Sequence, residues 1–464
     1  MIRPRFSSTL IASATTLLLS ACMSLAPEHK TPAAPVAASW SHADGNPTAA
    51  PAAELPWQSF YASDAKLSEL ISLALKNNRD LRVALLNVEQ ARALARVAEA
   101  NRLPTLNAGL SANRQPNTNG NGGSSNSYQA GLQISAFELD LFGRVKSQSD
   151  AALARYLASA EGGRAAQISL VAGVASSYLA LQADEELLVL ARQTVAARED
   201  TLRLTKLKFD GGAGSALDLS SAESAAASAR ASLAQAKRQR EQSENGLVLL
   251  LGQPLPVNLA QGQQLAAAQV FALPAGLPSE VLIKRPDVLQ AEQLLIAANA
   301  NIGAARAAFF PSISLTTSLG TASNELSQLF SNTVWSLGAQ ALMPIFDAGR
   351  NQANLEASKA AQGIAVAQYE KTVQQAFREV ADALAGRATY GEQTLAQIEQ
   401  TRAEAERLRL VELRFNNGAS NSLELLDAQR ASYAAQQALL QTRLGLLLNN
   451  VQLYKALGGG VDRS

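Results

Sequence analysis

Cysteine, histidine and aromatic residues are scarce in this chain of 464 residues, which has one cysteine, two histidines and 5% aromatic residues. A disulfide within the chain is impossible, because Cys22 is the only cysteine. Both histidines, His29 and His42, lie near the N-terminus, so the rest of the chain has no residue for histidine-based catalysis or histidine-ligated metals. The sequence also lacks a Gly-rich phosphate loop, a metal-ligand cluster and a nucleophile elbow, and it therefore predicts neither an enzyme nor a cofactor.

Charge is low and balanced, with 40 basic and 39 acidic residues that together make up 17% of the chain. Nucleic-acid-binding proteins and polybasic membrane anchors both need a clear excess of Lys and Arg. The sequence therefore predicts no nucleic-acid partner.

Residues 1–21 have the layout of a secretory signal peptide, with Arg3 and Arg5 before an apolar stretch and small residues at the end. The ending Leu-Ser-Ala-Cys resembles the bacterial lipoprotein signal, in which the cysteine becomes the lipidated first residue. We therefore expect a lipid on Cys22, and Met23 in place of Asp after it indicates the outer membrane. Residues 22–56 are rich in Pro, Ala and Ser and predict an extended, surface-hugging or flexible tether.

Four short segments alternate apolar and polar side chains with a period of two, near residues 105–113, 128–137, 312–320 and 333–342. The apolar face of the first segment consists of Leu106, Ala108, Leu110 and Ala112. This period is typical of a strand between lipid and water, and about 9–11 residues are needed to cross a bilayer. The sequence therefore predicts four transmembrane β-strands.

Four strands cannot close a membrane barrel, because single-chain barrels begin at about eight strands. An open sheet edge in lipid leaves backbone groups without partners, at a cost of several kcal/mol each. Other copies of the chain must therefore complete the wall. A soluble protein with two half-buried hairpins could show the same alternation, but the duplicated placement of the segments argues against it.

The chain aligns with itself at an offset of 206 or 207 residues. The matching landmarks are Pro104 with Pro311, Gly143-Arg144 with Gly349-Arg350, Phe209 with Phe415, and Leu251-Gly252 with Leu457-Gly458. We expect a first repeat at residues 57–252, a linker at 253–280 and a second repeat at 281–464, each with a strand pair and long helices at 143–250 or 349–457.

Each repeat should begin with a helix, at residues 65–101 and at 287–310, before its strands. The long helices carry apolar residues at alternating spacings of three and four, which predicts antiparallel coiled coils. These stripes are Ile168, Val171, Ala175 and Tyr178; Leu187, Leu190, Thr194, Ala197, Thr201 and Leu204; and Val366, Tyr369, Val373, Ala376, Val380 and Ala383. Taken alone, the stripes fit a soluble helical bundle equally well.

Breaks in the helical pattern occur at residues 209–214 and 415–418, where Gly and Asn cluster. Helices restart at once, since Ser215 with Asp218 and Asn421 with Glu424 have the spacing of helix caps. We expect each break to lie in the middle of a rod, where it could hold a short strand or turn.

Several short sequence words occur in a fixed order along nearly the whole mature chain. They are WQSFY at 57–61, NNRDLR at 77–82, GSALD at 214–218, LPSE at 277–280, RPD at 285–287, LLDAQR at 425–430 and LYKALGGG at 453–460. This order resembles the outer-membrane efflux ducts of the TolC and OprM type, and most of all their lipidated members.

The resemblance implies a mixed α and β membrane protein. Long antiparallel helical coiled coils would form a periplasmic α-barrel, and the four strands would contribute to a 12-strand β-barrel in a homotrimer. The chain would passively conduct drugs or other small toxic compounds out of the cell. Its implied partners are a periplasmic adaptor protein, a proton-driven inner-membrane transporter of the RND type, and outer-membrane lipid.

In this family the closed state is set where helix pairs converge at their periplasmic ends. The resemblance places these hairpin turns around residues 182–186 and 386–392. Asp184, Tyr390 and Glu399 occupy positions that resemble the aperture of the family, although the family usually has Asp where this chain has Glu399. Acidic residues at such a constriction would favour cations and repel one another in the closed state.

Two other functions remain open from the sequence. A duct of the same architecture could secrete proteins, although the lipid signal and the OprM-like words favour small molecules. A coiled-coil scaffold lipoprotein could bind partners without conducting, and it would be a monomer or dimer that can be extracted without detergent.

Overall fold

The computed structural model describes residues 25–40, 55–116, 123–256, 265 and 279–459. The chain divides into two compact units. One unit contains residues 1–34, 86–161 and 289–371, and the other contains residues 35–85, 162–288 and 372–464. We describe each unit by itself.

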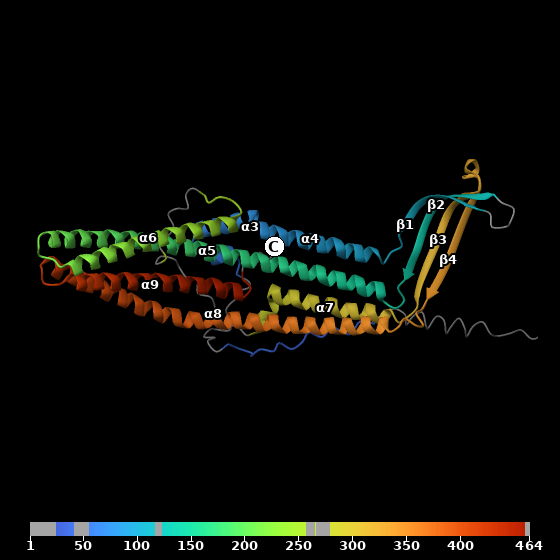
Figure 1. The fold of residues 1–464 in the computed structure, drawn as a ribbon. Helices are drawn as coiled ribbons and strands as arrows, with labels where there is room; N and C mark the ends of the chain where they lie inside the picture. The colour runs from blue at the N-terminus through green and yellow to red at the C-terminus, as the bar shows by residue number, and fades with distance from the viewer. Residues whose placement is uncertain (1–24, 41–54, 117–122, 257–264, 266–278, 460–464) are drawn as a thin grey trace, which may run out of the picture. The chain divides into compact units, whose positions relative to one another are not determined.

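The first unit contains one antiparallel sheet of four strands in the order β1-β2-β3-β4. The strands are β1 (Leu106–Pro116), β2 (Ser124–Leu139), β3 (Ser312–Ser323) and β4 (Thr333–Leu342), and Figure 1 shows them side by side. A short helix, η5 (Leu326–Gln328), lies between β3 and β4. All four predicted strands are present, and the strands of the two repeats meet where β2 pairs with β3.

The register gives the sheet one apolar and one polar face. Leu106 lies opposite Ile134, Leu132 lies opposite Leu319, and Leu319 lies opposite Trp335. The polar row next to them consists of Asn107, Gln133, Ser318 and Ser336. On the apolar face Leu106 and Trp335 are 63% and 75% exposed, which a lipid environment would accommodate and water would not.

Three glycines, Gly109, Gly131 and Gly320, follow one another across β1, β2 and β3 on the polar face. A Cβ atom on Gly131 would lie 2.5 Å from the carbonyl oxygen of Leu319, and one on Gly320 would overlap the carbonyl oxygen of Ala130. A Cβ points away from its sheet, so the neighbouring strand can reach it only if the sheet bends toward that face. The sheet is therefore creased between β2 and β3, with its polar face on the concave side.

The end of β2 differs from the end of β4 by a bulge between Ile134 and Phe137. Ala136 lies in this bulge with φ 50°, in the left-handed region. The bulge accounts for the change of the internal offset from 207 to 206, because β2 contains one residue that β4 lacks.

In the same unit, the N-terminal segment 25–34 lies along helix α7 (Pro286–Ala307). Arg306 donates to the carbonyl oxygen of Leu25 at 2.9 Å, and Thr31 donates to Glu292 at 2.7 Å. Between them, the amide of Asn299 contacts the His29 ring at 3.1 Å. The segment runs antiparallel to α7, because its first contact is near the end of α7 and its last contact is nearer the start. The lengths agree, since the six residue steps from Leu25 to Thr31 in extended form and the fourteen from Glu292 to Arg306 in a helix both span about 20 Å.

The second unit holds most of the long helices. They are α5 (Arg144–Asp210), α6 (Ala216–Leu251), α8 (Arg350–Asn416) and α9 (Ser422–Ala456), of which α5 and α8 belong to both units. In Figure 1 α5 pairs with α6, and α8 pairs with α9, as two helical hairpins. The predicted stripes that contain Val171 and Val373 are buried, except for Val366, which is half-buried.

The predicted stripe that contains Ala197 is only partly correct, because its member Thr201 is buried whereas most of its other members are half-buried. Ala197 is exposed, and the buried side of α5 near its end carries Ala191, Arg198, Thr201 and Thr205. Three of these four residues are polar, so the apolar period that we used does not follow the buried face there.

The predicted helix at residues 65–101 is two helices, α3 (Ala65–Asn77) and α4 (Arg79–Ala100), after a short helix α2 (Trp57–Phe60). Asn78 separates them, since its side chain accepts from the backbone N–H of Leu81 at 2.8 Å and donates to the carbonyl oxygen of Leu250 at 2.9 Å. The break therefore fixes the start of α4 against the end of α6.

A buried arginine connects the start of α7, which follows helix η4 (Ser279–Lys284), to the two helices of the second hairpin. Arg285 is 6% exposed and donates to Asp287, to Glu379 on α8 at 2.9 Å and to the carbonyl oxygen of Ala456 at 2.6 Å. Its hydrogen bonds to Asp287 and Glu379 outweigh burial and raise its pKa. Arg285 therefore remains charged, and its side chain contacts the three helices α7, α8 and α9.

Candidate functional site at the helical hairpin ends

The turns of the two helical hairpins lie at the glycine- and asparagine-rich breaks. Helix α5 ends at Asp210 and α6 begins at Ala216, and α8 ends at Asn416 and α9 begins at Ser422. Ser215 and Asn421 cap the helices that follow. Each side chain accepts a hydrogen bond from the backbone N–H three residues later, at 3.1 Å for Ser215 and 2.8 Å for Asn421. These breaks were expected in the middle of a rod, and that prediction was wrong.

The hairpin turns that the resemblance placed at residues 182–186 and 386–392 are absent. Helices α5 and α8 run without interruption through both segments, each over 67 residues. Gly386 lies inside α8, and its missing side chain leaves room for the amide of Asn449 on α9. Glycine inside a helix costs only about 1 kcal/mol, which close packing of two helices can offset.

Asp184, Tyr390 and Glu399 consequently lie inside helices. Asp184 accepts a hydrogen bond of 2.5 Å from Ser243 on α6, Tyr390 packs against Gly445 on α9, and Glu399 is exposed on α8. No hydrogen bond or ion pair joins any two of these three described residues. Their role at an aperture stays a prediction.

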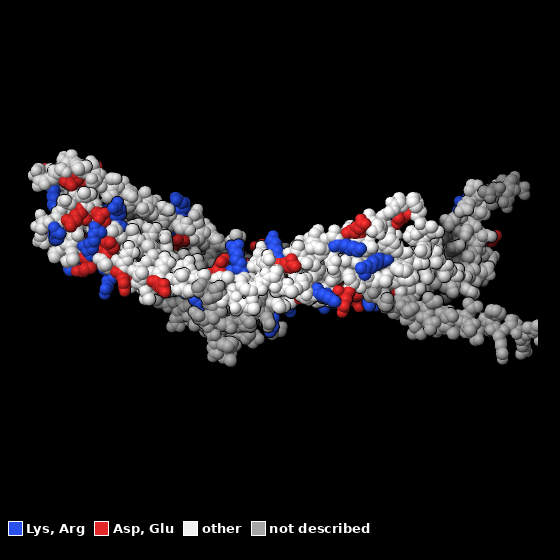
Figure 2. All heavy atoms as spheres, turned by 90° about the horizontal axis from the view of Figure 1, so that it is seen from below, with Lys and Arg blue, Asp and Glu red and all other residues white. Residues whose placement is uncertain are grey.

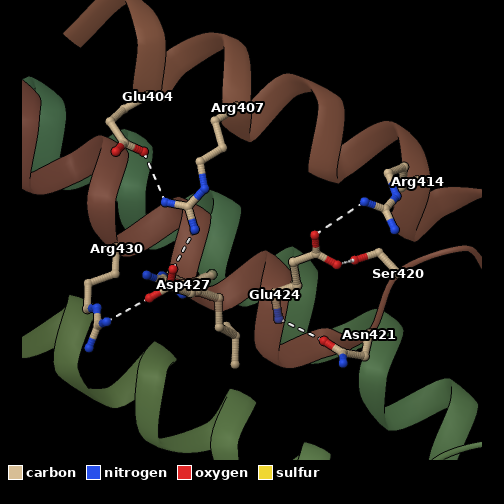
Figure 3. A network of polar contacts seen from close by, with 10 residues as sticks. Glu404, Arg407, Arg414, Ser420, Asn421, Glu424, Asp427 and Arg430 are labelled. Carbon is tan, nitrogen blue, oxygen red and sulfur yellow. Dashed lines mark hydrogen bonds and ion pairs between the residues drawn. The ribbon is translucent and has the colours of Figure 1, made fainter. Parts of the chain in front are cut away.

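A network of charged side chains lies close to the second hairpin turn (Figure 3). Asp427 on α9 accepts from Arg407 on α8 at 2.5 Å and from Arg430 at 2.6 Å. Arg407 also donates to Glu404 at 3.1 Å. The hydrogen bonds from Arg407, followed by those from Arg430, hold the pKa of Asp427 below its usual range. Asp427 is therefore ionised, and it joins the two helices of this hairpin.

A second group of polar contacts lies at the turn itself. Glu424 accepts from Ser420 and from Arg414, the latter at 3.4 Å, while its backbone N–H donates to Asn421 (Figure 3). These contacts satisfy the free amides at the start of α9 and place a carboxylate at its positive end. The turn therefore has a defined conformation.

The two hairpins contact each other through polar groups. Ser422, at the start of α9, donates to Asp218 in the first turn of α6. Gln429 donates to Thr201 at 3.2 Å, and Arg198 donates to the carbonyl oxygen of Leu426 at 3.2 Å. Hydrogen bonds from Ser215 and then Ser422 lower the pKa of Asp218. Polar contacts of this kind are separated more readily than a large apolar interface.

Arg198 has no carboxylate partner among the described residues, although its side chain is 8% exposed. Burial, and then repulsion by Arg430, lower its pKa. It lines an open groove of about 350 Å³ between α5, α6 and α9. Every residue that lines this groove from α6 is Ser or Ala, so this wall of the groove consists of small side chains.

Charged side chains of both signs gather near the hairpin ends on the face that Figure 2 shows. In the described part of the chain, no group of three or more His, Cys, Asp or Glu side chains is arranged to hold a metal ion. The geometry is that of a contact region whose parts are held by ion pairs, and Cys22 lies outside the described residues.

Sequence reasoning missed Arg407, Asp427 and Arg430. The word LLDAQR contains Asp427 and Arg430, but by itself it indicates only the resemblance to the family. The signal that could have identified them is the helix-cap pattern at residues 421–424. A helix cap directly after Gly and Asn indicates that the chain reverses there. The residues that follow the cap therefore lie at the end of the hairpin.

Comparison with known proteins agrees with this architecture. The model of the outer membrane efflux protein family matches residues 70–253 and again residues 277–459. The toluene efflux pump outer membrane protein TtgC of Pseudomonas putida is 45% identical over 464 residues, which cover 98% of this chain and 96% of that protein. The outer membrane protein OprJ of Pseudomonas aeruginosa is also 45% identical, over 100% of this chain and 97% of its own length.

Solved structures agree as well. The open state of the MtrE outer membrane channel of Neisseria gonorrhoeae superposes with a TM-score of 0.85 at 41% identity and covers 95% of this chain and 99% of that one. The predicted family resemblance, fold class and outer-membrane location are confirmed. The chain belongs to the outer membrane efflux protein family and is an outer-membrane channel component of an efflux system.

Proposed function

We propose that three copies of this chain form one continuous duct, which passively conducts small toxic compounds delivered by an inner-membrane transporter of the RND type and a periplasmic adaptor protein. The single observation that carries this proposal is the sheet of one chain. It has one apolar and one polar face, it curves toward the polar face, and it has two free edges. Such a sheet encloses water only when further copies continue it.

Several finer assignments belong to the same proposal. The double match of the family model supports two repeats at residues 57–252 and 281–464. The contacts of residues 25–31 with α7 support a lipidated Cys22 held beside the channel. Relatives that are named as toluene, solvent and antibiotic efflux proteins support small apolar or amphiphilic cargo.

Conduction is tested directly in a planar lipid bilayer. Purified protein should produce discrete current steps that persist for seconds, because a water-filled barrel needs no chemical cycle to pass ions. Protein that binds to the bilayer without any current would instead support a non-conducting scaffold.

We further propose that the charged network around Asp427 keeps the second hairpin in the closed arrangement. Replacing Asp427 by Ala frees Arg430 and removes the bridge from α9 to Arg407 on α8. We expect leak of bulky antibiotics into cells to rise roughly threefold to tenfold, because two ion pairs shift a two-state equilibrium by that order. The measurement is the minimal inhibitory concentration of a large antibiotic at equal expression.

A matched control exists on the same helix. Glu406 forms a similar pair with Arg409 at 2.8 Å, but both residues lie on α8 and join no second helix. Glu406→Ala should therefore leave the leak unchanged. Equal susceptibility of the two variants would contradict the role of Asp427.

Mild acid should not open the duct through this network. The arginines lower the pKa of Asp427, so the stabilisation by its charge is present above the unfolded pKa of about 3.9 and is lost only as the pH falls through the lower folded value. Closed-state current in bilayers should be the same at about pH 7 and pH 5. A rise in current between these values that Asp427→Asn abolishes would show that Asp427 titrates there.

A further inference from the structure

The sheet of one chain has two unused edges that are complementary to each other. Within the described sheet, β1 pairs only with β2, and β4 pairs only with β3. Every residue of β1 and β4 is exposed in the single chain. Neighbouring strands alternate in direction, so the free edge of β4 can join the free edge of another β1 in the same antiparallel sense.

The two hairpins of the sheet have identical registers after a shift of 207 residues. Leu106 opposite Ile134 in the first hairpin corresponds to Ile313 opposite Ala341 in the second. The pair at the other end agrees too, since Ala112 opposite Tyr128 corresponds to Leu319 opposite Trp335. The duplication seen in the sequence therefore extends to backbone pairing.

We propose that β4 pairs with β1 of the partner subunit in the register that β2 adopts with β3. The junction of β2 with β3 joins the end of one repeat to the start of the next, and the junction between two copies does the same. Leu132 opposite Leu319 then becomes Ala339 opposite Ala112 of the partner subunit, and Ile134 opposite Thr317 becomes Ala341 opposite Leu110 of the partner subunit. This inference rests on the proposed homotrimer.

The faces of the two strands agree with this register. Ala339 and Ala341 lie on the apolar face of β4, and Ala112 and Leu110 lie on the apolar face of β1. Gln340 on the polar face meets the polar Ser111 of the partner subunit. A slide by one residue would put apolar side chains into the lumen, whereas a slide by two would preserve both faces. The two faces therefore exclude every register that is shifted by an odd number of residues. The duplication selects one register among those that are shifted by an even number.

The glycine crease is only half repeated at this seam. Gly338 corresponds to Gly131, but Asn113 of the partner subunit stands where the inner junction has Gly320. The backbones can approach closely on the side of Gly338, while the Asn113 side chain needs space on the concave face. We therefore expect the wall to bend less sharply between subunits than between the repeats of one subunit.

Cysteine cross-linking tests the register, because Cys22 is the only natural cysteine. Ala339→Cys with Ala112→Cys, and Ala341→Cys with Leu110→Cys, should form disulfides between subunits on mild oxidation. Gln340→Cys with Ser111→Cys tests the neighbouring pair, since adjacent pairs alternate between the wider and the closer geometry. The product is a covalently linked multimer on a denaturing gel without reductant.

The control exchanges the partners of the same four positions. Ala339→Cys with Leu110→Cys, and Ala341→Cys with Ala112→Cys, are displaced by two residues, which places the Cβ atoms beyond disulfide range. We expect at least about tenfold less cross-linked product from these pairs. Every variant is first sized in detergent, so that misfolded protein is not scored.

The outcomes separate the register from the trimer. Cross-links at the expected pairs only would support the register. Trimers that cross-link only through the displaced pairs would overturn the register and leave the proposed function standing. A monomer in detergent would overturn the proposed function itself.

Discussion

Replacing Gly320 by Ala should nearly abolish the assembled channel, because the added methyl group has no room in the creased sheet. Its Cβ would overlap the carbonyl oxygen of Ala130 and approach the Cα of Gly131 to 2.7 Å. The obstacle is backbone on the neighbouring strand, so no side-chain rotation can relieve it, and overpacking commonly costs about 1–3 kcal/mol or more. The sheet would have to flatten, and a flatter sheet cannot close into a ring of the same size. The measurement is the amount of heat-modifiable multimer in outer-membrane fractions.

Another glycine of the same sheet provides the control. A Cβ on Gly109 would lie 3.7 Å from the side chain of Gln133. This is an ordinary contact, so Gly109→Ala should assemble normally. Normal assembly of Gly320→Ala would show that the crease is dispensable.

Replacing Arg285 by Met should strongly destabilise the second unit. The side chain fills a buried position and connects Asp287, Glu379 and the carbonyl oxygen of Ala456. Breaking a buried ion pair costs about 3–5 kcal/mol, and we expect the lower end because both carboxylates are partly exposed to water. Thermal unfolding followed by circular dichroism should start several degrees lower, since about 1 kcal/mol corresponds to 2–4 °C in a unit of this size.

Arg378 is the matched control for Arg285. It forms a pair with Asp382 on α8, and the two side chains are 81% and 68% exposed. Arg378→Met should therefore leave the unfolding temperature unchanged. Arg285→Lys should fall between wild type and Met, because Lys keeps the charge but cannot form the forked contact with a carboxylate. An unchanged unfolding temperature for Arg285→Met would contradict this account.

The sheet could be predicted from the sequence because its signal is local. Alternation with a period of two decides which side chains share a face, so Leu106 and Asn107 could be assigned to opposite faces without any tertiary information. Alternation could not assign the register, that is, which residues of two neighbouring strands lie opposite each other, since a slide by two residues preserves both faces. The crease at Gly131 and Gly320 also depends on which strands are neighbours.

The helical hairpins show where the reasoning failed. Gly386 looked like part of a turn, but it lies inside α8 and makes room for Asn449. The true turn precedes Asn421, whose cap was recognised and then assigned to a break within a rod. The network around Asp427 could be predicted only after this turn had been placed correctly, because the turn brings Arg407 and Asp427 together.

The central claim is that one chain supplies only part of a closed wall. Native mass spectrometry of the protein released from detergent counts its copies directly. We predict a complex of three chains, the assembly that the family resemblance implies, in which four strands from each copy give a ring of twelve with no free edge. A stable single chain that still conducts in a bilayer would contradict the claim.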